Sequence, residues 1–116
     1  MTNFYSYNYS SNRRNNGTPY LNLTANKNKL VSKIDQMKAD CDYTKNYWIC
    51  EKRSVQKKID NMKGSFGYLY SSEYRELEMK LVEIDNKIQT IESNFLRNKL
   101  PLEVEIKSIE RQLAAL

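Results

Sequence analysis

The sequence predicts an all-α protein: a long antiparallel coiled-coil helical hairpin with an extended N-terminal arm and a kink or break at Pro101. Two patterns carry this prediction. Apolar residues recur at alternating three- and four-residue spacing over residues 74–95, and a column of apolar residues recurs every seven positions over residues 34–62. Gly64 and Gly67 separate the two periodic regions, so a turn is expected between two helices.

Residues 1–23 are expected to form the arm. They are rich in Asn, Ser and Tyr, contain Gly17 and Pro19, and show no sustained period of 2 or 3.6. Aromatic rings interleaved with arginines suit docking on another surface, where burial offsets the cost of ordering. The residues expected to bind a partner in this way are Tyr5, Tyr7, Tyr9, Arg13, Arg14 and Tyr20.

The first helix is expected over residues 24–63, with Thr24 as its N-cap. Its main apolar column contains Ile34, Cys41, Trp48, Val55 and Met62. A second column begins with Leu30 and Met37 and is then interrupted by Thr44, Glu51 and Lys58. The first helix therefore has one good seam column and one poor one.

Residues 64–72 are expected to form the loop, with Ser72 capping a second helix over residues 73–116 and Glu73 near its positive end. This helix carries the stronger heptad signal of the two. We name its apolar stripe the ridge, and it consists of Tyr74, Leu77, Leu81, Ile84, Ile88, Ile91 and Phe95.

Beyond Pro101 the stripe resumes with Leu102, Ile106, Ile109, Leu113 and Leu116. A proline inside a helix removes a backbone hydrogen bond and clashes with the preceding turn. Because the interval from Phe95 to Leu102 is still one heptad and no glycine intervenes, a kinked continuous helix is favoured. A separate third helix that folds back is the alternative.

The net charge of +5 is unevenly distributed. Residues 1–34 contain five basic residues and no acidic one, whereas residues 35–116 hold 14 of each kind. A basic segment on a neutral body is typical of an arm for an acidic partner such as nucleic acid, an anionic membrane face or an acidic protein lattice, and the alternative is a solvated tail. The expected helices also differ in charge: residues 24–63 carry ten basic and five acidic residues, and residues 71–116 carry seven and nine, which favours pairing.

The stretch 41–50 holds both cysteines and the only tryptophan. Cys41 falls in the seam column, whereas Cys50 lies on the opposite helix face, about 13.5 Å along the axis, so the two cannot form a disulfide within one helix. With no histidine and no third cysteine, a zinc site within one chain is not expected. Tyr43 and Tyr47, together with Cys50, either form an adhesive edge for a neighbour or lie along their own hairpin.

No catalytic constellation is visible. The chain has no histidine, no GxGxxG and no GxxxxGK[ST] motif, so an enzyme is not expected, and neither a cofactor nor a metal is implied. No apolar run approaches the length of a transmembrane helix, and the first residues lack the apolar core of a secretory signal. These observations predict an intracellular protein, in the cytoplasm or within a large assembly, with organelle targeting as the weaker alternative.

The functional hypothesis follows from unequal helix faces. Twelve large apolar residues follow the second helix, while the first helix offers about seven, so the hairpin is expected to need a protein partner or a second copy. The seam residues expected to bind it are Trp48, Leu77, Leu81, Ile84, Ile88, Ile91 and Phe95.

The sequence thus favours a non-catalytic structural component that packs into a larger complex, such as a cytoskeletal lattice, a virus particle or an organelle complex, while its arm threads along neighbouring subunits. The alternative is a nucleic-acid-binding protein that uses the basic aromatic arm and a coiled-coil dimerisation rod. A weaker option is a regulatory adaptor that recruits another coiled coil.

Overall fold

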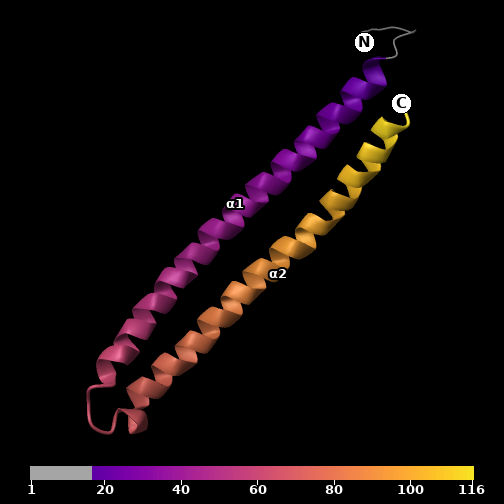
Figure 1. Cartoon of the computed structure of the whole chain (residues 1–116). Helices are drawn as coiled ribbons and strands as arrows, with labels where there is room; N and C mark the ends of the chain where they lie inside the picture. Colours follow the sequence, from indigo (N-terminus) through magenta and orange to yellow (C-terminus); the bar gives the residue numbers. More distant parts are fainter. Residues whose placement is uncertain (1–16) are drawn as a thin grey trace, which may run out of the picture. The chain divides into compact units, whose positions relative to one another are not determined.

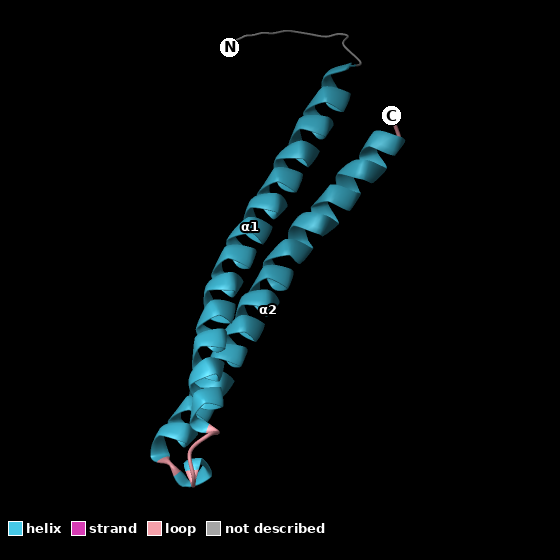
Figure 2. Cartoon of the chain, turned by 60° about the vertical axis from the view of Figure 1, so that its left-hand side comes forward, coloured by secondary structure: helices cyan, strands magenta, loops and turns pink. Residues whose placement is uncertain are grey.

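The computed structural model describes residues 17–116, and within this range the chain is all-α without strands. Helix α1 spans Gly17–Met62, a short 3-10 helix η1 spans Tyr68–Tyr70, and helix α2 spans Ser72–Ala114 (Figure 1). Figure 2 shows the two long helices joined by a single short connection. The helical hairpin predicted from the sequence is confirmed.

The chain divides into two compact units, and both units contain parts of both helices. One unit is Asp35–Leu100, in which the second half of α1 packs against the first part of α2 across the connecting loop. The other combines residues 17–34 of α1 with Pro101–Leu116 of α2. Each unit is therefore an antiparallel helix pair.

Helix α1 begins at Gly17, so the prediction that residues 17–23 belong to an extended arm is wrong. Pro19 is compatible with this start, because the first turn of a helix needs no intrahelical N–H donor. Leu23 is half-buried and stands seven residues before Leu30, so it extends the column that continues to Met37. Packing against the end of α2 gives a reason for the helix to begin earlier than Thr24.

The loop 64–72 is close to its prediction, but its helix cap is not the expected residue. Ser71 caps α2: its Oγ accepts hydrogen bonds from the backbone N–H groups of Glu73 at 3.1 Å and Tyr74 at 3.4 Å. The Ser71 carbonyl also accepts the first intrahelical bond, from Arg75 at 3.3 Å. Ser72, which the sequence suggested as the cap, is the first residue inside the helix.

Helix α2 continues through Pro101, so the alternative of a separate third helix is wrong. The ring of Pro101 removes one backbone donor, yet the residues on both sides remain helical. The apolar stripe explains why continuity is preferred, since Phe95 and Leu102 both face inward and are half-buried. The boundary between the compact units falls at this proline.

The core of each unit is small. In the unit 35–100, Val55 and Ile59 of α1 pack with Ile84 of α2, and each of the three side chains is at most 3% exposed. Further residues pack against this cluster while remaining partly exposed, namely Trp48, Tyr74, Leu77, Leu81 and Ile88. In the other unit, Ile109 is the one buried hydrophobic residue among those described. A two-helix pair has no third layer to cover the flanks of its seam, which explains this limited burial.

Ion pairs across the two helices share one register. Lys52 pairs with Asp85 at 2.8 Å and Lys45 with Glu92 at 2.9 Å in one unit, and Lys27 pairs with Glu110 at 3.0 Å in the other. In all three pairs the two residue numbers add to 137. Because lysines of α1 meet acids of α2 at one fixed offset, the charge difference between the helices also selects their antiparallel alignment.

Candidate interaction surfaces

The ridge of α2 lies against α1, and most of it remains half-exposed. Of its seven residues, only Ile84 is buried, while the others keep part of their surface in solvent. Leu77, Leu81 and Ile88 touch the cluster around Ile84. The seam residues expected to bind a partner thus pack against the other helix of the hairpin. Another surface could contact only the parts of them that remain exposed.

Trp48 is positioned by both helices. Its indole packs against the core cluster and meets the ring of Tyr47 edge-on, with ring centroids 5.0 Å apart. From α2, Lys87 places its Nζ 4.6 Å from the centroid of the Trp48 ring, a distance suited to a cation–π contact. The single tryptophan is therefore a packing element of the hairpin, and part of its surface remains exposed.

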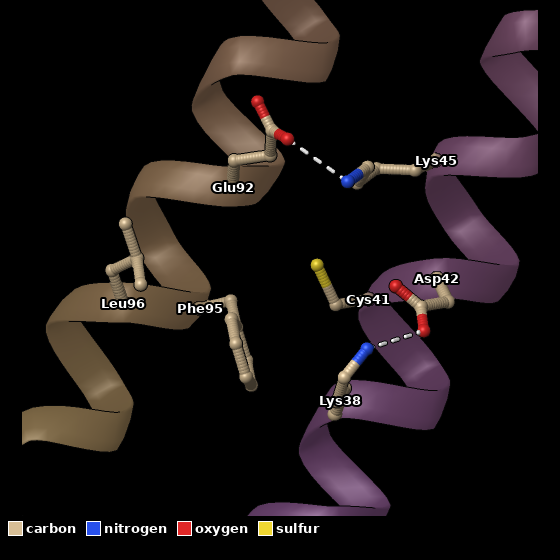
Figure 3. Close-up of a pocket in the computed structure, with 7 residues that line it drawn as sticks. All are labelled: Lys38, Cys41, Asp42, Lys45, Glu92, Phe95 and Leu96. Atoms are coloured by element: carbon tan, nitrogen blue, oxygen red, sulfur yellow. Dashed lines mark hydrogen bonds and ion pairs between the residues drawn. The ribbon is translucent and has the colours of Figure 1, made fainter.

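A shallow pocket of about 360 Å³ opens between the helices where the small side chain of Cys41 faces α2. Figure 3 shows the Cys41 sulfur directed into the space between the two ribbons, with Phe95 across from it. The lining residues are Lys38, Cys41, Asp42, Lys45, Glu92, Phe95 and Leu96. A small residue opposite a large one leaves this gap in the seam.

The charged groups around this pocket are already paired. Lys38 bonds Asp42 at 3.0 Å on the same helix, and Lys45 donates a hydrogen bond of 2.9 Å to Glu92 across the gap (Figure 3). That hydrogen bond, reinforced by the negative charge of Glu92, raises the pKa of Lys45 above its ordinary value. Both carboxylates that line the pocket, Asp42 and Glu92, are therefore engaged by lysines.

Both cysteines are free thiols, with Cys41 half-buried and Cys50 exposed. Cys50 shares an outer region of α1 with Tyr43 and Tyr47, which are 80% and 56% exposed. Of the two alternatives left open by the sequence, the structure places Tyr43 away from the hairpin, whereas Tyr47 also contacts Trp48. These side chains form an exposed aromatic edge on α1.

The tip of the hairpin carries large exposed apolar side chains, which the residue pattern did not predict. Phe66 is fully exposed, Tyr70 is 85% exposed and Leu69 is 55% exposed. These three residues, which we name the tip cluster, lie in a stretch from Gly64 to Ser72 that contains no charged side chain. One feature of the sequence could have predicted this surface. Turns that contain glycine and serine are usually polar, whereas this one contains large apolar residues.

Most of the arm residues expected to bind a partner are not among those that the structure describes. Tyr5, Tyr7, Tyr9, Arg13 and Arg14 lie outside the described residues. Tyr20 lies in the first turns of α1 and is exposed. The described start of α1 also presents Lys29 and Lys33, one helical turn apart and both exposed.

Two further features concern the described residues as a whole. Over residues 17–116 no group of three or more Cys, Asp or Glu side chains is arranged to hold a metal ion. Neither α1 nor α2 has a segment that combines the length and apolar character required to span a bilayer.

With this geometry established, the chain was compared with protein-family models, with curated proteins and with solved structures, and none of the three comparisons gives a match.

Proposed function

We propose that this chain is a non-catalytic structural component whose helical hairpin packs into a larger protein assembly. The observation that carries the proposal is the incomplete burial of the ridge, in which only Ile84 of seven large residues is removed from solvent. Another helix or a second copy could cover the remaining edges, as in a four-helix bundle. The arm would then run along neighbouring subunits.

The register of the hairpin supports a structural role. Ion pairs such as Lys52 with Asp85 and Lys45 with Glu92 fix one alignment of α1 and α2 in the unit 35–100. A hairpin with a fixed register presents its outer residues at constant spacing, which a repeated contact in an assembly requires. Exposed Leu96 and Leu100, one turn apart on α2, extend the apolar surface beyond the ridge.

The test measures self-association of the purified full chain. Light scattering over a range of concentrations should report a mass above the 13.8 kDa of one chain. Replacing both Leu96 and Leu100 with serine should lower that mass while leaving the helical circular dichroism spectrum unchanged, because both side chains are exposed in the hairpin. A chain that stays a single copy at all concentrations and binds no dye specific for apolar surfaces would contradict a need for a covering second copy.

A second experiment tests association with other proteins. Removal of residues 1–16, which precede α1, should preserve helicity but weaken incorporation into the native complex. The readout is the stoichiometry of complexes isolated from the source cells with the full and shortened chains. Equal incorporation of both would remove the arm from the proposal.

A second candidate function is nucleic-acid binding through the N-terminal part of the chain. It is favoured by the absence of acidic residues from residues 1–34 and by the exposure of Lys29 and Lys33 on α1. Phosphate contacts would weaken steeply with salt, and tyrosines could stack on single-stranded bases. Filter binding to a single-stranded oligonucleotide at two salt concentrations tests this function, and no retention at the lower concentration would exclude it.

A further inference from the structure

The hairpin tip combines apolar exposure with an absence of charge. Phe66, Leu69 and Tyr70 are exposed. They belong to the stretch that joins α1 and α2, whose backbone is seen in Figures 1 and 2. No charged residue occurs from Gly64 to Ser72, although 28% of the whole chain is charged. Burial of these three side chains against another surface would be favourable, because each leaves a large apolar area in water.

Three backbone N–H groups of the tip donate hydrogen bonds to nearby carbonyls. Ser65 donates its N–H to the Met62 carbonyl at 2.9 Å, Tyr70 donates to Gly67 at 3.0 Å, and Ser71 donates to Tyr68 at 3.1 Å. Gly67 adopts a φ of 76°, which allows the sharp change of direction before η1. The N–H groups of Ser65, Tyr70 and Ser71 therefore do not lose water without compensation when the loop enters an apolar medium.

The base of the tip is held by packing. The rings of Tyr68 and Tyr74 meet edge-on with centroids 5.3 Å apart, and Tyr68 is half-buried. This contact anchors η1 to the first turn of α2, so the tip cluster is presented by a supported turn. A pre-arranged cluster loses less conformational entropy when it binds.

We propose that the tip cluster inserts into the interfacial region of a lipid bilayer and attaches the hairpin peripherally to membranes. The cluster has no charged group for directional recognition, whereas a bilayer interface accepts apolar side chains without directional partners. The phenol of Tyr70 suits the level of the headgroups, where tyrosine is favoured. The nearest charged residues, Lys63 before the loop and Glu73 after it, are opposite in sign, so the attachment does not require anionic lipids.

This inference goes beyond the proposed assembly function and does not depend on it. Three side chains give weak, reversible attachment to a bilayer. A multimeric assembly that presents several tips would bind more strongly through multivalency. Variants at the tip leave the ridge unchanged, so loss of membrane binding and loss of self-association can be observed separately.

The experiment is flotation of the full chain with vesicles of pure phosphatidylcholine, which excludes electrostatic attraction of the basic arm to anionic lipid. The wild-type chain should float with the vesicles at high lipid concentration. Phe66→Ser should lower the partition coefficient by about tenfold or more, because it removes one large apolar group. The matched control, Tyr43→Ser, removes an aromatic side chain exposed on α1 and should change partitioning by less than about twofold.

Two additional readouts make the result decisive. Partitioning should stay constant when the salt concentration is raised from about 0.05 to about 0.5 M, since apolar insertion is not screened. Phe66→Trp should show a blue-shifted emission that brominated phosphatidylcholine quenches, after subtraction of the wild-type spectrum, which reports Trp48 alone. Circular dichroism confirms that each variant is folded.

Three results would overturn the proposal. The first is that the wild-type chain does not float, which would assign the tip to an apolar pocket on a protein instead. The second is equal partitioning of Phe66→Ser and wild type. The third is binding that requires phosphatidylserine and disappears with salt, which would identify the basic arm as the lipid-binding element.

Discussion

The Nζ atom of Lys52 lies 2.8 Å from Oδ1 of Asp85, and this pair defines the offset that the other two interhelical ion pairs repeat. Both side chains of the pair are about half exposed, at 44% and 50%. An exposed pair of this kind contributes little to stability, so its main effect is on alignment: a shift of one helix by a single residue would separate all three pairs.

Charge reversal tests this register. Lys52→Glu and Asp85→Lys should each lower the free energy of unfolding by about 0.2–1 kcal/mol, because each places like charges opposite one another. The double variant, with the two charges exchanged, should recover most of the loss. Thermal melts of the four proteins at low ionic strength give the free energies of unfolding of this double-mutant cycle. If the loss in the double variant equals the sum of the two single losses, the two residues do not face each other.

The core of the unit 35–100 predicts a strong contrast between neighbouring positions. Ile84→Ala removes a side chain that is 2% exposed between Val55 and Ile59, so it should cost about 2–4 kcal/mol. Val82→Ala, at a position that is exposed on the same helix, should cost less than about 0.5 kcal/mol. Urea unfolding followed by circular dichroism compares the two. Similar midpoints would show that α2 is rotated relative to the structure described here.

The N-cap of α2 distinguishes two adjacent serines. Ser71→Ala removes the Oγ that accepts hydrogen bonds from Glu73 and Tyr74, and it should cost about 1 kcal/mol. Ser72→Ala should be nearly neutral or slightly favourable, because Ser72 is exposed within the helix, where alanine is preferred. The thermal midpoints of the two variants give the answer, and a larger loss for Ser72→Ala would place the cap one residue later.

The glycines of the loop should also respond differently. Gly67 has a φ of 76°, so Gly67→Ala should lower the free energy of unfolding by about 1 kcal/mol. Gly64 has no atoms within 4 Å of where a Cβ would stand and no positive φ, so Gly64→Ala should be tolerated. Chemical unfolding of both variants checks this contrast, and equal stability would indicate that the turn is not fixed at Gly67.

Alkaline pH should weaken the fold in part through Tyr74. The hydrogen bond of 2.8 Å that its hydroxyl donates to Glu78 raises the pKa of Tyr74 above the ordinary value of a tyrosine. A raised pKa in the folded state means that the stabilisation is complete below the unfolded pKa, about 10, and is lost as pH rises through the folded value. Thermal melts of wild type and Tyr74→Phe from about pH 8 to about pH 11 should therefore converge.

The pKa of Lys45 is raised for a related reason, its hydrogen bond to Glu92, and its contribution is lost in the same direction. Because Lys45 is present in both the wild type and Tyr74→Phe, its effect cancels in their difference. A difference between the two proteins that stays constant across this range would contradict the assigned role of the Tyr74 hydroxyl.

Much of the fold could be predicted from local pattern. The ridge spacing identified α2, and the column through Trp48 and Val55 identified α1, because helical periodicity is written into successive residues. The helix start was misplaced because Pro19 and Gly17 suggested irregular structure, while the seven-residue spacing from Leu23 to Leu30 gave a weaker opposing signal. The tip cluster was missed because periodicity describes helix faces and gives no information about which loop side chains remain exposed.

By itself the sequence determined the helical content, the turn between two helices, the faces that pair and the separation of the two cysteines, since all of these depend on residue spacing along a helix of known geometry. Only the tertiary structure decided the offset that pairs Lys52 with Asp85, the choice of Ser71 as the cap, the continuity of α2 through Pro101 and the outward projection of Phe66. These features depend on how the second helix packs against the first. Packing, capping and charge pairing act together there, and residue spacing along one helix does not specify their combined result.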